Sequence, residues 1–339
     1  MRRLREILLF VLLMGGFSAF AQPLTGKAYE CYQASDWACA KTWIDSAIVS
    51  EERNNSQTWQ LRGVIYRKLE TPQTLDFRNI AIESLVQARN LDVDNKYKDK
   101  IDELLFNTII RYYNDAVTYL EGSSLKESEK TYHVYKEKYS KYLNPGNDFK
   151  QSDIDYYNAL GSRYMGEIEL LEASPKKDEL IDKAIGLFTY VIELDSTNWQ
   201  ANFNTGIIYY NRGADLAMHA DPTLFIENIE ELDKLLTRSV ELFKQALPYL
   251  HRAYRLDSSN VGVMEGITGC YYGLNDNDNY PKYQKILDEH QIDSLMERQA
   301  KNPNDLDILR DILRIYSQTI INEEQYLKYK AIYDKLTSE

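Results

Sequence analysis

Two short patterns alternate along this chain and predict an all-α repeat protein. The first, a glycine followed three residues later by a tyrosine, occurs at Gly26/Tyr29, Gly63/Tyr66, Gly161/Tyr164, Gly206/Tyr209 and Gly269/Tyr272. The second, an alanine followed by a large apolar residue at four and a small residue at seven, occurs at Ala40/Ile44/Ala47, Ala81/Leu85/Ala88, Ala184/Phe188/Val191 and Ala246/Leu250/Ala253. Such spacings place residues on one helix face. We expect about seven helix pairs stacked into an α-solenoid, some with extended helices or insertions.

The residues between these patterns predict where helices end. Leu-Asp pairs close three of the repeats and lead into turn-forming residues such as Ser196-Thr197-Asn198 and Ser258-Ser259-Asn260. Serine, threonine and asparagine side chains accept hydrogen bonds from the free amides at a helix start. We therefore expect these segments to end one helix and to cap the next.

Small residues in both patterns predict close helix packing. A glycine such as Gly206 and an alanine such as Ala246 leave no bulky side chain between two helix axes. We expect the axes to approach closely there, with Tyr209 and Leu250 filling the space on either side.

The longest insertion separates Gly206 from Ala246. Apolar residues keep a helical spacing through it, at Ile226, Ile229, Leu232, Leu235, Leu236, Val240, Phe243 and Leu247. This spacing predicts a second helix that extends beyond the body of the repeats. The extension either packs on its own neighbour or offers a docking surface.

The two patterns resemble those of the tetratricopeptide repeat (TPR) family. Its unit of about 34 residues carries Trp-x2-Leu-Gly-x2-Tyr on one helix and Ala-x3-Phe-x2-Ala on the next. The best match is Trp59, Gly63 and Tyr66 with Ala81, Leu85 and Ala88, and the resemblance covers most of residues 22–339. The third repeat departs from the pattern, because Ile110 stands where the glycine is expected. We expect a wider or shifted helix pair there.

The resemblance also implies a binding surface, since TPR proteins commonly hold extended peptides or helices in a groove lined by their first helices. The family's groove positions lie three residues before the glycine and one, four and five after it. They hold Gln60, Val64, Arg67, Lys68, Asn107, Arg111, Asn114, Asp115, Asn158, Ser162, Met165, Gly166, Phe203, Ile207, Tyr210 and Asn211. The implied groove is polar at its amino end and more apolar further on. Val64 and Ile207 interrupt the lysine–asparagine set with which some members hold a terminal carboxylate.

Residues 1–21 predict a removable signal peptide. Arg2, Arg3 and Arg5 precede an apolar run of 14 residues from Ile7 to Phe20, which ends in a small-x-small site. A membrane-spanning helix needs about 20 such residues, so we expect cleavage after Ala21 and no integral membrane segment afterwards. Residues 22–339 are expected to form one exported solenoid with a weak seam near 144–148. The resemblance to bacterial TPR proteins favours the periplasm.

Net charge argues against two classes of partner. The leader carries three arginines and one glutamate, so its removal changes the formal net charge from −12 to −14. An acidic surface of this kind repels nucleic acid phosphates and anionic lipid headgroups. We expect neither nucleic acid nor a membrane as the partner.

The three cysteines raise the question of a disulfide in an exported chain. Cys31 and Cys39 fall on either side of a predicted turn at Ala34-Ser35-Asp36, where they could face each other across a helix pair. The alternative is two small buried thiols that replace alanine. Cys270 follows the helix glycine Gly269 and is expected to lie in the core.

No pattern of catalytic or metal-binding residues is present in the sequence. The four histidines, His133, His219, His251 and His290, have no second ligand at metal spacing, and no nucleophile elbow, phosphate loop or dinucleotide glycine run occurs. We expect neither a cofactor nor a metal, and no enzymatic activity.

The sequence therefore favours a non-enzymatic periplasmic scaffold or adaptor that binds protein or peptide segments in the groove of a TPR-like solenoid. The competing hypothesis is a glycan-binding helper of the outer membrane, since some sugar-capturing proteins are built on TPR helices. Those proteins usually carry a lipid-anchoring cysteine, which is missing here.

Overall fold

The computed structural model describes residues 23–71, 73–74, 76–122, 124–220 and 229–338, and every regular element among them is a helix. The predicted leader and cleavage site lie outside these residues. None of the described helices is both long and apolar enough to cross a membrane.

The chain divides into two compact units, and the boundary falls between Phe149 and Lys150, next to the predicted turn at 144–148. The first unit contains α2 (Pro23–Gln33), α3 (Trp37–Ala47), the 3-10 helix η2 (Glu51–Asn54), α4 (Ser56–Leu69), α5 (Asp76–Leu91), α6 (Lys98–Glu121) and α7 (Leu125–Tyr142). The second contains α8 (Lys150–Glu169), α9 (Pro175–Leu194), α10 (Trp199–His219), α11 (Ile229–Leu256), α12 (Val261–Gly273), α13 (Tyr280–Lys301), α14 (Leu306–Arg314), the π-helical turn η3 (Ile315–Thr319) and α15 (Glu323–Thr337).

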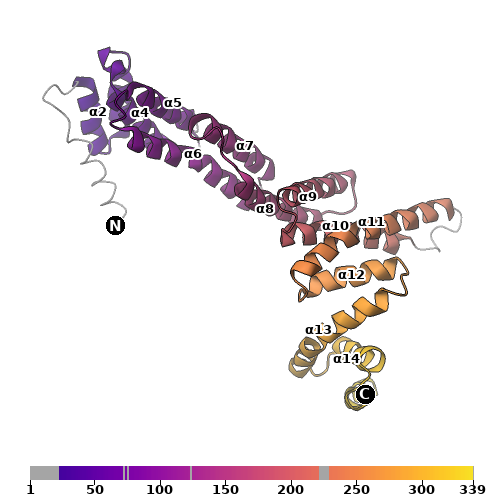
Figure 1. The fold of residues 1–339 in the computed structure, drawn as a ribbon. Helices are drawn as coiled ribbons and strands as arrows, with labels where there is room; N and C mark the ends of the chain where they lie inside the picture. Colours follow the sequence, from indigo (N-terminus) through magenta and orange to yellow (C-terminus); the bar gives the residue numbers. More distant parts are fainter. Residues whose placement is uncertain (1–22, 72, 75, 123, 221–228, 339) are drawn as a thin grey trace. The chain divides into compact units, whose positions relative to one another are not determined.

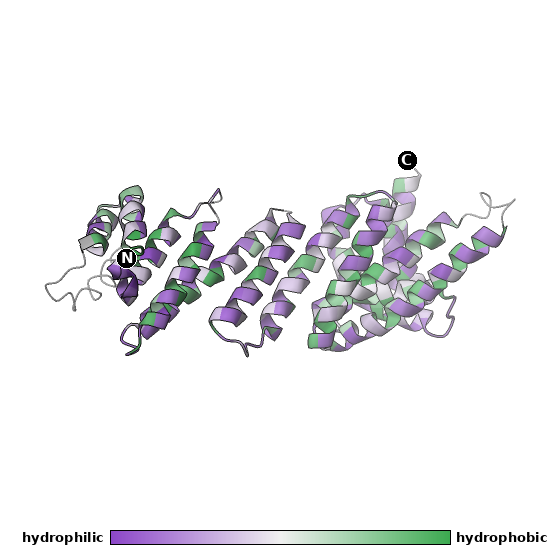
Figure 2. Cartoon of the chain, turned by 90° about the horizontal axis from the view of Figure 1, so that it is seen from above, coloured by the Kyte–Doolittle hydropathy of each residue, from purple (hydrophilic) through white to green (hydrophobic). Residues whose placement is uncertain are grey.

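Consecutive helices pack in pairs, so the described residues form seven helix hairpins (Figure 1). Hairpins 1 to 3 are α2/α3, α4/α5 and α6/α7, and hairpins 4 to 7 are α8/α9, α10/α11, α12/α13 and α14–η3/α15. Hydrophobic and hydrophilic residues alternate along these helices (Figure 2). The predicted all-α fold of about seven hairpins is confirmed.

The sequence predicted that each motif glycine faces a small residue of the second helix, and the structure places a large apolar residue there instead. A Cβ placed on Gly206 would lie 2.6 Å from Leu250 Cγ, and one placed on Gly161 would lie 2.7 Å from the ring of Phe188. Gly63 meets Leu85 in the same way, at 2.7 Å. Each of these glycines thus makes room for the large apolar residue of the second helix, which packs directly against it.

Two glycines of the repeated pattern do not follow this rule. A Cβ added to Gly26 would meet no described atom within 4 Å, and one added to Gly269 would meet Tyr210 of the preceding hairpin rather than its own second helix. In hairpins 2, 4 and 5 the motif glycine therefore packs against the large apolar residue of its own second helix. In hairpin 6 it packs against a tyrosine of the preceding hairpin.

Hairpin 3, where the glycine is missing, packs through an aromatic cluster. Ser128 Oγ donates a 2.7 Å hydrogen bond to the carbonyl of Ala116, which joins α7 to α6. The ring of Tyr113 lies edge-on to Tyr132 and Tyr135, with centroids 6.0 and 5.4 Å away. Ser128, Tyr132 and Tyr135 keep the spacing of the second pattern with aromatic residues at its larger positions, which explains why that pattern was not recognised in the sequence.

The inter-repeat turns behave as predicted. The side chain of Asn198 caps α10 by accepting from the amide of Ala201, and Asn260 caps α12 by accepting from Val263. Asp195 accepts hydrogen bonds from the amide and hydroxyl of Thr197, and Asp257 makes the equivalent pair with Ser259. The same capping chemistry therefore recurs at two successive turns.

One carboxylate joins hairpins 1 and 2. Asp45 on α3 accepts hydrogen bonds from Lys41 Nζ at 2.9 Å, Arg62 Nε at 3.1 Å and Tyr66 Oη at 2.7 Å, the last two from α4. Burial raises the pKa of Asp45, but these hydrogen bonds outweigh it, and the pKa lies below the usual 3.8. The ionised form is thus favoured in the folded chain.

We expect this contact to make the first unit sensitive to acid. Because the pKa is lower in the folded state, the carboxylate stabilises the fold above about pH 4, and its contribution is lost as the pH falls through the folded-state pKa. The stability difference between wild type and Asp45→Asn should be constant near neutral pH and shrink under acid. Urea unfolding followed by fluorescence measures it, because Trp37, Trp43 and Trp59 all lie in these hairpins. A difference that persists unchanged at about pH 3 would contradict the account.

Candidate protein-binding surface

The first helices of hairpins 2 and 3 bring two of the predicted groove residues together. Arg111 on α6 donates from Nη1 to the carbonyl oxygen of Arg67 on α4, at 3.2 Å. Lys68 and Asn114 are exposed, and Asn107 is half-buried. Gln60 is only 4% exposed, and its Nε2 has no hydrogen-bond partner among the described residues. This face therefore combines exposed polar groups with one buried amide.

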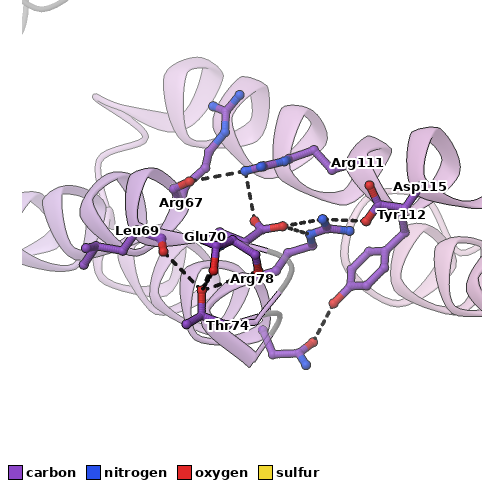
Figure 3. Close-up of polar contacts among 10 residues, drawn as sticks. Arg67, Leu69, Glu70, Thr74, Arg78, Arg111, Tyr112 and Asp115 are labelled. Atoms are coloured by element: carbon purple, nitrogen blue, oxygen red, sulfur yellow. Dashed lines mark hydrogen bonds and ion pairs between the residues drawn. The ribbon is translucent and has the colours of Figure 1, made fainter. Parts of the chain in front are cut away.

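A cluster of four charged side chains connects α4, α5 and α6, and two of the four are buried (Figure 3). Glu70 follows α4 directly and pairs with Arg78 at the start of α5, and both side chains are at most 3% exposed. Arg78 Nη2 also lies 2.7 Å from Asp115 Oδ2, while Arg111 Nη1 lies 2.9 Å from Glu70 Oε2. The contact of Arg111 with Glu70 Oε2 is an ion pair rather than a directional hydrogen bond. Two carboxylates and two guanidinium groups thus balance each other.

The cluster extends to an aromatic ring. The guanidinium of Arg78 lies 4.4 Å from the ring centroid of Tyr112, whose hydroxyl donates to Asn79 Oδ1 at 3.0 Å. Burial raises the pKa of Tyr112 to about 12, so its hydroxyl stays protonated at neutral pH. Burial lowers the pKa of Arg78, but the contacts with Glu70 and Asp115 outweigh that effect and leave it raised.

This cluster changes the interpretation of Arg111. The sequence places it among the groove cations, and the structure shows that its charge is already paired with Glu70. Glu70 and Arg78 were not singled out from the sequence, because they lie outside both repeat patterns. They meet Arg111 and Asp115 only when hairpin 3 packs on hairpin 2.

In the second unit, Asn158 on α8 occupies the position that Gln60 holds on α4, three residues before the motif glycine. Its Nδ2 donates to Asn198 Oδ1 at 3.2 Å, which links α8 to the cap of α10. The residue is 7% exposed, and its Oδ1 has no partner among the described residues. Two repeats therefore keep a buried amide with one unused polar atom at the same position.

The predicted apolar residues of this surface pack within the chain. Phe203 on α10 stacks on Trp199 with ring centroids 4.9 Å apart, and a Cβ on Gly262 of α12 would lie 3.3 Å from its ring. Tyr210 packs against Phe243, and a Cβ on Gly269 would lie 2.5 Å from its ring. Both rings are partly buried in the core between hairpins 5 and 6. Asn211, the last residue of the predicted set, is exposed.

The cysteines have separate environments. Cys31 and Cys39 form a disulfide across hairpin 1, with their Cα atoms 5.7 Å apart. Cys270 is buried in the core of hairpin 6, and burial raises the pKa of its thiol to about 12. It therefore remains a neutral thiol at physiological pH. The described part of the chain holds no group of three or more histidine, cysteine or carboxylate side chains able to bind a metal.

Comparison with known proteins returned structures alone. No protein-family model and no curated protein matches the sequence. A structure of MamA (MSR-1 C2) is 14% identical over 68% of this chain and 97% of its own, with a TM-score of 0.32. YrrB, described as a TPR protein with an unusual peptide-binding site, is 14% identical over 76% of this chain and 97% of its own, also with a TM-score of 0.32. The TPR domain of P58(IPK) is 13% identical over 94% and 92%, with a TM-score of 0.24.

The fold class follows from the chain's own helices. The described residues form seven consecutive hairpins, in three of which the motif glycine seats the large residue of the second helix. Asparagine caps recur at the turns between hairpins 4, 5 and 6. The chain has a TPR-like, all-α solenoid fold.

Proposed function

We propose that this protein is an exported, non-enzymatic scaffold that binds protein or peptide segments along the first helices of its hairpins. The supporting observation is the pair of equivalent amides, Gln60 and Asn158, each with one buried polar atom that lacks a partner among the described residues. An amide can donate to a peptide carbonyl and accept from a peptide N–H. A hydrogen bond formed between a guest's main chain and either of these two atoms would replace no hydrogen bond that the atom already makes.

The polar residues around these amides support a polypeptide guest. Lys68 and Asn114 are exposed on the first helices of hairpins 2 and 3, where they could reach a bound segment. The charges of Arg111 and Asp115 are paired inside the chain, so they shape this face rather than contribute free charge to it. Recognition there would depend mainly on hydrogen bonds to the guest.

Site-specific photo-crosslinking in intact cells tests this surface. A photoreactive residue placed at Lys68 or Asn114 should form protein adducts, which mass spectrometry identifies. Matched control sites are Glu83 on α5 and Lys130 on α7, which are exposed on second helices of the same hairpins. Equal labelling from the two sets of sites, or no protein adduct at Lys68 and Asn114, would count against binding along the first helices.

Export is proposed from the leader pattern and supported by the disulfide. Cleavage after Ala21 would leave α2 intact, because that helix begins at Pro23. The disulfide between Cys31 and Cys39 suits an oxidising compartment such as the periplasm. Mass spectrometry of protein from the periplasmic fraction should find an amino terminus at Gln22 and the two cysteines joined. An intact leader on protein that remains in the cytoplasm would refute this part of the proposal.

A further inference from the structure

The second helix of hairpin 5 carries a row of apolar residues that other described residues cover at its carboxyl end and leave exposed at its amino end. Ile229, Leu236, Val240 and Leu247 follow at spacings of seven, four and seven, so they share one face of α11. His251 and Tyr254 continue the same face and pack against Tyr283 of hairpin 6. The face is thus an interface at its carboxyl end.

Hairpin 6 is too short to cover the rest of this face. The last residue of α12, Gly273, lies against the ring of Phe243. The residues of α11 that precede Phe243 extend up to 14 positions further, or about 21 Å of helix. Figure 1 shows α11 reaching past α12. Ile229 is 71% exposed and Leu236 is 43% exposed, whereas Val240 is half-buried.

The opposite side of this extension packs on its own hairpin. Ser239 Oγ donates a 2.7 Å hydrogen bond to the carbonyl of Gly213 on α10, and Leu242 is fully buried. The extension is therefore anchored on α10, while the row from Ile229 to Val240 faces away from that contact.

Two opposite charges flank the apolar row. Asp233 and Lys244 are eleven residues apart, or about three helical turns, so they lie on the same side of α11. Both are exposed, and neither forms an ion pair with any residue that the structure describes. The nearby charges on the outer face are already paired within the helix, as Glu230 with Lys234 and Arg238 with Glu241.

We propose that this face binds the same face of a second copy of the chain, with the two α11 helices antiparallel. In one register Leu236 of each copy lies beside Val240 of the other copy, so the apolar contact uses the part of the row that precedes Phe243. The same register places Asp233 beside Lys244 of the other copy. Twofold symmetry makes this ion pair twice, and the apolar contacts are repeated in the same way. The two unpaired charges are complementary only in the antiparallel arrangement.

Sedimentation equilibrium of the disulfide-bonded mature chain, over a range of concentrations, tests this proposal. Wild type should show a reversible monomer–dimer equilibrium. Leu236→Glu should raise the dimer dissociation constant about tenfold or more, because it places charge in the apolar contact. The matched control Leu170→Glu, at a site that is 86% exposed outside this face, should leave the equilibrium unchanged.

A charge exchange tests the register itself. Asp233→Lys and Lys244→Asp should each weaken the dimer, because each places like charges opposite one another, and the double exchange should restore it. Circular dichroism of every variant verifies that these exposed substitutions leave the helices intact. A monomer at all concentrations, a dimer that survives Leu236→Glu, or a double exchange that fails to restore association would overturn the proposal.

Discussion

Asp288→Ala is expected to lower the free energy of unfolding of the carboxyl-terminal hairpins by about 3 kcal/mol. Asp288 on α13 is completely buried and accepts hydrogen bonds from both terminal nitrogens of Arg314, at 2.9 and 3.0 Å. Thr319 Oγ1 and Gln284 Nε2 donate to the same carboxylate, at 2.6 and 2.8 Å. Its removal leaves these donors without their acceptor.

The size of this effect follows from the uneven burial of the pair. Breaking a buried ion pair typically costs about 3–5 kcal/mol, because the remaining charge is uncompensated. The Arg314 side chain is 36% exposed, so water can solvate part of its charge, and we expect the lower end of that range.

The measurement is chemical denaturation followed by circular dichroism, with Asp293→Ala as the control. Asp293 is exposed on the same helix, and its replacement should change stability by no more than about 0.5 kcal/mol. If the two variants unfolded at the same denaturant concentration, the carboxylate of Asp288 would not hold hairpin 7 to hairpin 6.

Gly206→Ala is the second substitution with a large expected effect, a loss of about 1–3 kcal/mol. The added methyl group would lie 2.6 Å from Leu250 Cγ, 2.8 Å from Leu250 Cδ2 and 3.1 Å from the Leu250 amide nitrogen. Because the close atoms include backbone and the base of the side chain, the helices must move apart to accept it.

Gly186→Ala is the matched control for this substitution. Gly186 lies inside α9, is exposed, and has nothing within 4 Å of a Cβ position. Alanine is the better helix former, so this variant should gain about 0.5–1 kcal/mol. Opposite signs for the two changes in thermal unfolding are the expected result, and a gain at both positions would show that Gly206 is not a point of close contact.

The repeat architecture was predictable because it depends on local periodicity. Spacings of three, four and seven fix which residues share a helix face, and the residues after Asp195 and Asp257 carry their own capping chemistry. Both features act over a few residues, and both appear in the structure as predicted.

The contact partners were harder to predict, because spacing gives the face of a residue and not the residue that it meets. The sequence suggested glycine against alanine, whereas Leu250 and Phe188 seat directly over Gly206 and Gly161. Tyr210 belongs to the predicted groove set by register, and the structure packs its ring beside Gly269 of the next hairpin. A contact with a residue of another hairpin leaves no pattern in the sequence around either residue.

The buried charges show the same limit more strongly. Glu70 and Arg78 flank a connection between two helices, where charged residues usually remain in water. Their burial arises only when α6 brings Arg111 and Asp115 over them. The candidate surface was therefore predictable in its helices, and the pairing of its charges required the folded chain.

The central claim is that the missing side chain of a motif glycine makes room for the large apolar residue of the second helix. A double-mutant cycle between Gly206→Ala and Leu250→Ala tests this claim most directly. Leu250→Ala alone should cost about 2–5 kcal/mol, because it leaves a cavity in a fully buried site. The account predicts that the methyl group of Gly206→Ala then fits, so that the double variant is more stable than the sum of the single effects by at least about 1 kcal/mol. Additive effects, within about 0.5 kcal/mol, would contradict it.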